Sequence, residues 1–184
     1  METKQNRKVQ YTKRVLTEAL VNLMQERSVA DISIKELCAA ADVNRSTFYA
    51  HYKDQYGILQ ELEDVAIETT EQIIGKYTLQ PSKIALLQII KESLDLTAGN
   101  VNWTRVLLSE QGDIHFQRKL FSLILKNEMT RFKNDEQIDD ITKEYYLTFG
   151  LNGSVALIQH WIKNGMNIPK EKLARMLLKL NRQD

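Results

Sequence analysis

Polar and aromatic side chains lie close together over residues 44–54, where residue types and spacing are suited to binding. Successive residues of an α-helix are rotated by about 100°, so a helix that buries Phe48 turns Tyr52 to nearly the same side. The outward side and its flanks then carry six small or polar residues: Arg45, Ser46, Thr47, Tyr49, Ala50 and His51. This outward surface is the first candidate for a binding site.

The chemistry of this surface favours contact with duplex DNA. Small side chains let a helix approach a groove closely, and the hydroxyls of Ser46 and Thr47 can donate to phosphates or base edges. Arg45 can hold a guanine with two hydrogen bonds, and Tyr49 offers a hydroxyl or a ring to a phosphate or a thymine methyl group. From these residues alone, a generic helical corner with all its aromatic residues in the core remains the alternative.

Short helices must position this surface, and apolar spacing with capping signals predicts three of them, over residues 12–26, 34–41 and 45–52. Ser33 and Glu36 have the spacing of a capping box before the second helix. Asn44 can cap the third helix, and Asp54 can cap a fourth that continues to about residue 76. The second and third helices lie only a turn apart, which predicts a helix-turn-helix.

The composition favours an all-α protein. Of 184 residues, 43% are hydrophobic and 27% are charged, and only two prolines and seven glycines are available for hairpin turns. No apolar run approaches the ~18–20 residues of a membrane span, and the single Cys38 can form neither an internal disulfide nor a thiolate zinc cluster. We therefore expect a cytoplasmic protein without a membrane partner.

Charge is distributed unevenly along the chain. Residues 1–14 contain five basic residues and one acidic residue, whereas residues 54–80 contain six acidic residues and one basic residue. This asymmetry indicates that one end of the molecule meets a polyanion, although two solvated faces would give the same pattern. The basic N-terminus could reach phosphates or an adjacent groove.

The segment ISIKELCAAADVNRSTFYAHYKD, residues 32–54, closely resembles the DNA-binding signature of the TetR family of transcriptional regulators. Its most specific part is STFYxHYKD, and the similarity covers about residues 8–60. Two positions depart from the family pattern: Asp42 stands where glycine is common, and Gln55 stands where lysine is usual. Aspartate tolerates the left-handed conformation that such a turn needs.

The resemblance implies a role for each matching residue in DNA binding. Ser33 and Lys35 would contact phosphate at the start of the second helix, and His51 and Lys53 would contact the DNA backbone. The residues that would face the major groove or its walls are Arg45, Ser46, Thr47 and Tyr49. The implied division is a DNA-binding domain over residues 1–54, with the helix-turn-helix at about 33–52, and a regulatory and dimerisation domain over residues 55–184.

Beyond residue 77 the pattern stays helical, with long segments over residues 114–132, 138–164 and 170–180. The resemblance implies a homodimer that pairs through the last two long helices, here about residues 145–164 and 170–180. The expected dimer residues are Gly150, Gly153, Val155, Ile158 and Ile162, and the alternative is that this stripe is intramolecular core.

The resemblance also implies a small-molecule pocket among the middle helices. Its expected lining residues are Trp103, Phe116, Tyr145 and Phe149, with Phe121 and Tyr146 as further candidates. Ordinary core packing is the alternative for aromatic residues in helices. A protein partner could replace the small molecule.

Enzymatic motifs are missing from the sequence: there is no Gly-rich phosphate loop, Gly-x-Ser-x-Gly or His-Glu-x-x-His. His115 and His160 stand apart, without cysteines or carboxylates at ligand spacing, so no metal and no cofactor is expected. The expected function is a transcriptional regulator of double-stranded DNA, a repressor that binds a palindromic operator as a homodimer and is released by a small molecule. The alternatives are a helical protein-interaction module and an activator controlled by a protein partner.

Overall fold

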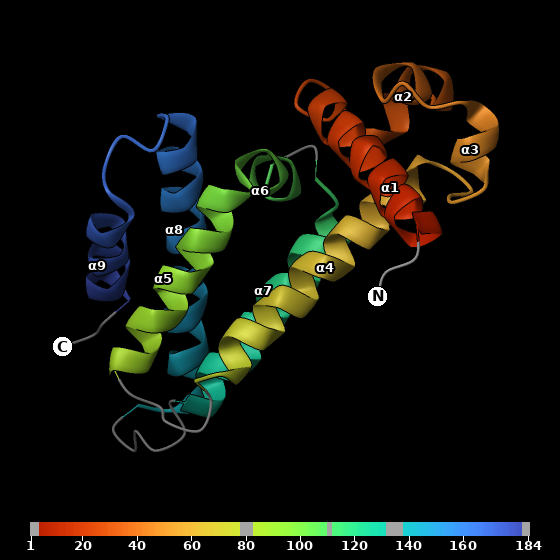
Figure 1. The fold of residues 1–184 in the computed structure, drawn as a ribbon. Helices are drawn as coiled ribbons and strands as arrows, with labels where there is room; N and C mark the ends of the chain where they lie inside the picture. The colour runs from red at the N-terminus through yellow and green to blue at the C-terminus, as the bar shows by residue number, and fades with distance from the viewer. Residues whose placement is uncertain (1–3, 78–82, 110–111, 132–137, 182–184) are drawn as a thin grey trace.

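The computed structural model describes residues 4–77, 83–109, 112–131 and 138–181, and this part of the chain is helical, without strands (Figure 1). The predicted all-α class is confirmed. The helices are α1 (Lys4–Leu23), α2 (Ile34–Ala40), α3 (Arg45–Tyr49), α4 (Gln55–Gly75), α5 (Lys83–Gly99), α6 (Val101–Leu107), α7 (Ile114–Arg131), α8 (Asp140–Lys163) and α9 (Lys170–Leu180), with a short 3₁₀ helix at Val29–Asp31. None of the described helices is long and apolar enough to cross a membrane.

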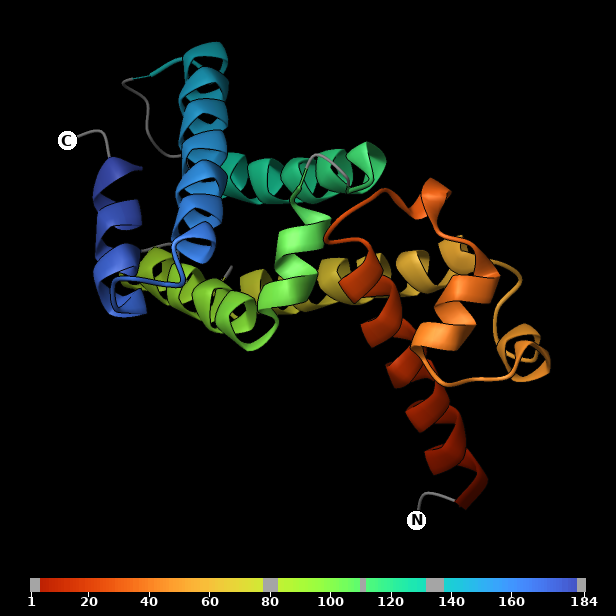
Figure 2. The same cartoon turned by 90° about the horizontal axis from the view of Figure 1, so that it is seen from above.

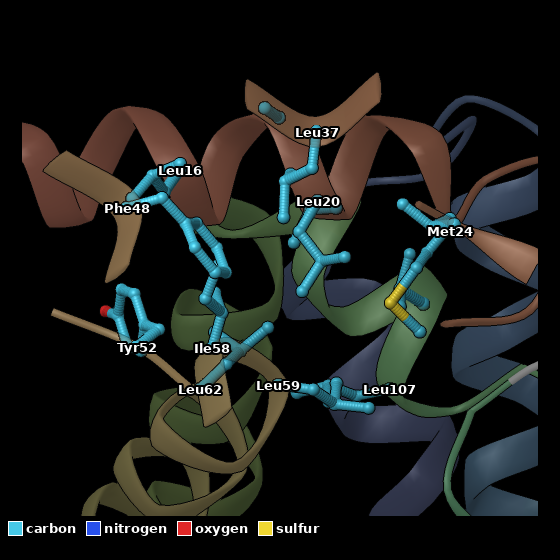
Figure 3. Close-up of a cluster of buried hydrophobic side chains, with 14 of the residues drawn as sticks. Leu16, Leu20, Met24, Leu37, Phe48, Tyr52, Ile58, Leu59, Leu62 and Leu107 are labelled. Carbon is cyan, nitrogen blue, oxygen red and sulfur yellow. The ribbon is translucent and has the colours of Figure 1, made fainter. Parts of the chain in front are cut away.

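Helices α1, α2 and α3 form a head at one end of the molecule, and the N-terminal half of α4 packs against it (Figures 1 and 2). Its core is a cluster of buried apolar side chains that the helical spacing of α1 and α4 turns inward (Figure 3). The cluster includes Leu16, Leu20, Met24, Leu37, Phe48, Tyr52, Ile58, Leu59 and Leu62. This packing fixes the orientation of α3, which is too short to be stable alone.

The core of the head continues into the rest of the molecule through α4. Val106 and Leu107 of α6 and Phe116 of α7 belong to the same buried cluster. Helix α7 packs along α4, and both views place α4 as the link between the head and the remaining helices (Figures 1 and 2). The expected division after residue 54 precedes α4, whose first turns complete the core of the head.

A second buried cluster holds α5, α8 and α9 together at the opposite end of the molecule (Figure 2). Its members are Leu94, Trp161, Ile162, Leu173, Ala174 and Leu177. The Trp161 indole nitrogen donates to the carbonyl oxygen of Ile168 at 2.8 Å, which satisfies the polar edge of a buried ring. Lys170 forms an ion pair with Asp95, which adds a polar link between α9 and α5.

Several predicted helix ends are wrong. Helix α1 begins at Lys4 rather than near residue 12, so the basic residues described near the N-terminus lie on a helix. Helix α3 ends at Tyr49 rather than near residue 52, because the backbone N–H groups of His51 and Tyr52 both donate to the Phe48 carbonyl oxygen and close a turn. The end expected at residue 132 lies outside the described residues.

Candidate DNA interface

The start of α2 is fixed by the predicted capping box. The Ser33 hydroxyl accepts from the Glu36 N–H at 3.2 Å and donates to the Glu36 carboxylate at 2.7 Å, while the Ser33 N–H donates to the same carboxylate at 3.1 Å. These hydrogen bonds from Ser33, together with Arg27, lower the pKa of Glu36 to about 2. Glu36 is therefore ionised at neutral pH, and the Ser33 hydroxyl is already engaged in the cap.

The turn between α2 and α3 is built on Asp42, which has a φ of 52°. This is the left-handed conformation expected at the position where the family usually has glycine. The next residue, Val43, donates its N–H to the Cys38 carbonyl oxygen at 2.9 Å and packs against the core of the head. The turn therefore sets the angle at which α3 leaves α2.

Helix α3 buries one side and exposes the other. The side chain of Phe48 is fully buried and that of Tyr52 is 7% exposed, as their spacing predicted, and their ring centroids lie 6.1 Å apart. Tyr49 is 57% exposed, and its ring meets the edge of Phe48 at a centroid distance of 5.4 Å. Tyr49 is therefore outside the core, contrary to what the generic-corner alternative requires.

The expected DNA-contacting residues divide into two groups. Those with exposed side chains are Ser33, Lys35, Arg45, Ser46, Tyr49 and Lys53. Thr47 and His51 are half-buried, because they line a groove between α1 and α3. We call it the α1–α3 groove, and its lining residues are Lys8, Val9, Thr12, Ser46, Thr47, Ala50 and His51.

The α1 side of this groove was not among the expected site residues. Lys8 and Thr12 lie one helical turn apart on α1, and the Thr12 hydroxyl donates to the Lys8 carbonyl oxygen at 3.0 Å. The excess of basic residues before residue 15 was the available signal, but without the early start of α1 it could not be placed opposite α3.

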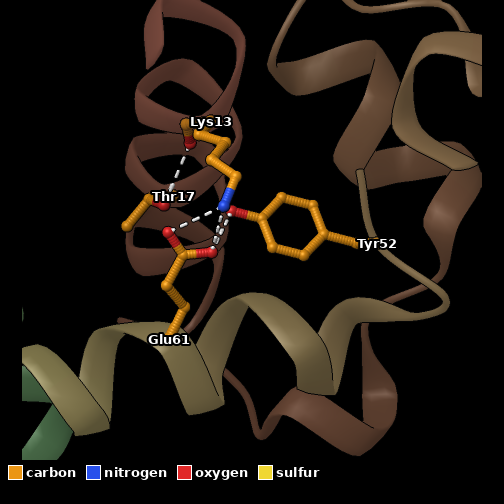
Figure 4. A network of polar contacts seen from close by, with 4 residues as sticks. All are labelled: Lys13, Thr17, Tyr52 and Glu61. Atoms are coloured by element: carbon orange, nitrogen blue, oxygen red, sulfur yellow. Dashed lines mark hydrogen bonds and ion pairs between the residues drawn. The ribbon is translucent and has the colours of Figure 1, made fainter. Parts of the chain in front are cut away.

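A polar cluster joins α1, the turn after α3, and α4 (Figure 4). The Glu61 carboxylate accepts from Lys13 Nζ at 2.8 and 3.0 Å and from the Tyr52 hydroxyl at 2.9 Å. Burial alone would raise the pKa of Glu61, but the hydrogen bonds from Lys13 and Tyr52 hold it below its usual value. Burial and the bond to Glu61 raise the pKa of Tyr52, so this hydroxyl keeps its proton.

The residues expected to line a ligand pocket fall into two groups, one buried and one exposed. Phe116 is buried in the core of the head, and Trp103 packs against the same cluster from α6. Tyr145 and Phe149 are 75% and 78% exposed on α8, so their expected place in an interior lining is wrong. Several sides of α8 carry apolar residues, and packing against α5 and α9 turns these two outward.

The expected dimer residues are also divided. Ile162 is 4% exposed and Ile158 packs against the same cluster, so the expectation that Ile162 faces a partner is wrong and the intramolecular alternative holds for it. Gly150 is half-buried and faces Asn181, just beyond α9 of the same chain, where an added Cβ would clash with the side-chain amide oxygen. Gly153 is exposed and Val155 is half-buried.

A helix-turn-helix head carried by a larger helical body is the architecture of a DNA-binding transcriptional regulator rather than an enzyme. A family described as bacterial regulatory proteins, tetR family, matches residues 16–62, and a family described as transcriptional regulator C-terminal region matches residues 85–183. The chain belongs to the TetR family of transcriptional regulators.

Known proteins resemble the chain over most of its length. NalD of Pseudomonas aeruginosa, the secondary repressor of the MexAB-OprM multidrug efflux pump, has 16% identity and a TM-score of 0.72 over 94% of this chain and 96% of its own. FadR of Bacillus subtilis, in complex with stearoyl-CoA, has 17% identity and a TM-score of 0.65 over 91% and 96%. These likenesses show the fold.

A curated relative is matched over part of its length. YxbF of Bacillus subtilis (strain 168), an uncharacterized HTH-type transcriptional regulator, is 21% identical over 166 residues. The match covers 89% of this chain and 43% of YxbF, so this chain spans less than half of that relative.

Proposed function

We propose that the protein is a sequence-specific repressor that binds a palindromic operator as a homodimer and is released by a small molecule. The observation that carries this proposal is that α3 and the turn after it have a buried side and an exposed side. Phe48 and Tyr52 are buried, and Arg45, Ser46 and Tyr49 are exposed beside the α1–α3 groove. Repression by occlusion of a promoter is consistent with NalD, a repressor of the same fold.

In this proposal, the head forms two kinds of DNA contact. Arg45, Ser46, Thr47 and Tyr49 face the major groove or its walls, where hydrogen bonds to base edges carry sequence information. A second set contacts phosphates and consists of Ser33, Lys35, His51 and Lys53. Phosphate contacts supply affinity for DNA of any sequence. At Ser33 both the hydroxyl and the backbone N–H already bond to Glu36, so a phosphate contact there has to compete with the cap.

Removing Arg45 and removing Lys35 should have different effects. We expect Arg45→Ala to cost ~1–3 kcal/mol of discrimination between the operator and other sequences. Lys35→Ala should weaken binding to all sequences alike and reduce the salt dependence by about one phosphate per subunit. Titrations of both variants against operator and scrambled duplexes at several salt concentrations measure both effects. A change of base preference in the Lys35 variant alone would reverse our assignment.

The homodimer is proposed to form through an exposed apolar face on α8 and α9. Ile141, Tyr145 and Phe149 follow one another at intervals of four residues on α8 and are 70–78% exposed. Exposed Leu180 adds to the apolar surface from α9, and exposed Gly153, with open space around it, permits close helix approach. An apolar face of this kind is typical of a protein interface.

A charge in the middle of this face should disrupt the dimer. We expect Phe149→Asp to raise the dimer dissociation constant by ~100-fold or more, because a carboxylate buried at the interface has no partner. Ile114→Asp, at a 52% exposed position on α7, is the matched control and should leave the dimer intact. Sedimentation equilibrium measures both, and a Phe149 variant that dimerises like the wild type would exclude this face.

Selection of bound duplexes from a random pool tests the function as a whole. A dimer presents two copies of α3, so the enriched sequences should contain two inverted half-sites about one helical turn of DNA, or a multiple of it, apart. An enriched pool with one half-site would contradict the homodimer, and a pool without enrichment would contradict sequence-specific recognition.

Adding stearoyl-CoA, the ligand of FadR, to the operator complex is a first test for release.

A further inference from the structure

Glu61 is an acidic residue in the head of a protein that must attract phosphate. On electrostatic grounds alone its carboxylate opposes DNA binding, and removing its charge should strengthen attraction to any duplex. Its contacts indicate a different role, because it accepts hydrogen bonds from Lys13 of α1 and from Tyr52, just beyond α3 (Figure 4). Charge-assisted hydrogen bonds of this kind hold geometry more firmly than neutral ones.

The two residues held by Glu61 are chain neighbours of the two sides of the α1–α3 groove. Lys13 directly follows Thr12, which lines the groove on α1, and Tyr52 directly follows His51, which lines it on the other side. The turn at His51 and Tyr52 is tied to the Phe48 carbonyl oxygen. A shift of Lys13 relative to Tyr52 is therefore a shift of one side of the groove relative to the other.

The cluster lies at the edge of the head, where the Glu61 side chain is 47% exposed and Tyr52 is buried in the core. Lys13 Nζ lies 5.4 Å from the Tyr52 ring centroid, and its side chain is 30% exposed, so the ammonium group packs over the ring and beside the carboxylate. Glu61 comes from α4, which is anchored in the core by its neighbour Leu62. The carboxylate thus connects both sides of the groove to the rigid part of the head.

We propose that Glu61 is a positioning residue for DNA binding, which fixes the separation of α1 and α3 so that both meet the same stretch of duplex. Its effect passes through Lys13 and Tyr52 and needs no contact between Glu61 and DNA. The proposal rests on the proposed function, because the groove is taken to face the operator.

Two variants separate this role from simple electrostatics. Glu61→Gln removes the charge that holds Lys13, and Tyr52→Phe removes a hydroxyl without changing charge or ring packing. Glu71→Gln is the matched control, because Glu71 is an exposed acid on the same helix, away from the cluster. Each variant is titrated, as the full chain, against the operator selected by the wild type and against a scrambled duplex.

We expect Glu61→Gln to weaken operator binding by about 3- to 10-fold, because solvent screens the half-exposed ion pair, while binding to the scrambled duplex stays equal or becomes tighter. Tyr52→Phe should weaken operator binding in the same direction, and Glu71→Gln should change neither. Operator binding by the Glu61 variant that equals or exceeds the wild type would overturn the proposal.

Hydrogen exchange of the free protein gives a test without DNA. The amides of Ala50, His51 and Tyr52 should exchange faster in the Glu61 and Tyr52 variants than in the wild type or the Glu71 variant, because the turn after α3 loses its anchor. Unchanged exchange there would also overturn the proposal. If the wild type selects no operator, the proposed function fails, while the exchange rates still decide whether Glu61 anchors this turn.

Discussion

Phe48→Ala is expected to destabilise the head by ~3–5 kcal/mol, the usual cost of removing a buried aromatic side chain. The Phe48 ring is fully buried among Leu16, Leu37 and Ile58, so helices α1, α2 and α4 would all border the resulting cavity (Figure 3). Urea unfolding followed by circular dichroism measures the loss. An unchanged unfolding curve would overturn the orientation of α3 on which every proposed DNA contact depends.

The neighbouring residue provides the control for this prediction. Tyr49 is 57% exposed, so Tyr49→Ala should change stability by less than ~1 kcal/mol while it weakens DNA binding. Two adjacent aromatic residues should therefore show opposite patterns, one mainly in stability and the other mainly in binding. Equal effects on stability would mean that the exposed and buried sides of α3 had been assigned wrongly.

Glu63→Gln is expected to remove a pH-dependent contribution of roughly 3 kcal/mol from the free energy of unfolding of the protein. Glu63 is 5% exposed on α4, and among the described residues its Oε1 has no hydrogen-bond partner. Burial, reinforced by Asp113 and Asp64 and opposed by Lys119, raises its pKa from 4.5 to about 7. The raised pKa means that the folded protein favours the neutral acid.

The sign follows from proton binding. Between about pH 4.5 and 7 the folded chain binds a proton at Glu63 that the unfolded chain has released. The stabilisation of the folded state by this proton is complete below that range and is lost as the pH rises through 7. The stability of the Glu63→Gln variant relative to the wild type should therefore increase from pH 5 to pH 8. Glu68→Gln, an exposed acid on α4, is the control, and parallel pH profiles for all three proteins would contradict the raised pKa.

The sequence predicted the head more accurately than the remainder of the chain. In the head, helix caps form between residues that are close in sequence. Ser33 and Glu36 form the cap that their spacing predicted, and Asp54 accepts from the Gly57 N–H at the start of α4. The interval from Phe48 to Tyr52 predicted the buried side of α3 for the same reason. These features depend on residues within one or two turns of each other.

The misassigned residues of α8 show what the sequence could not decide. This helix carries apolar residues on several sides, so periodicity alone could not show that Ile162 faces α5 and α9 while Tyr145 and Phe149 face outward. The contact between Lys13 and Glu61 joins residues 48 positions apart, both of types common on exposed helix surfaces. Only the packing of α1 against α4 brings them together.

The way α4 completes the core of the head limits how chimeric regulators can be built from this chain. A graft that ended after Asp54 would separate Phe48 and Leu16 from Ile58 and Leu62, and would expose apolar surface on both fragments. A junction after Gly75 would transfer the head with its own supporting helix. The recipient residues that take the places of Val106, Leu107 and Phe116 would then have to fit the transplanted surface, so closely related recipients are the suitable ones.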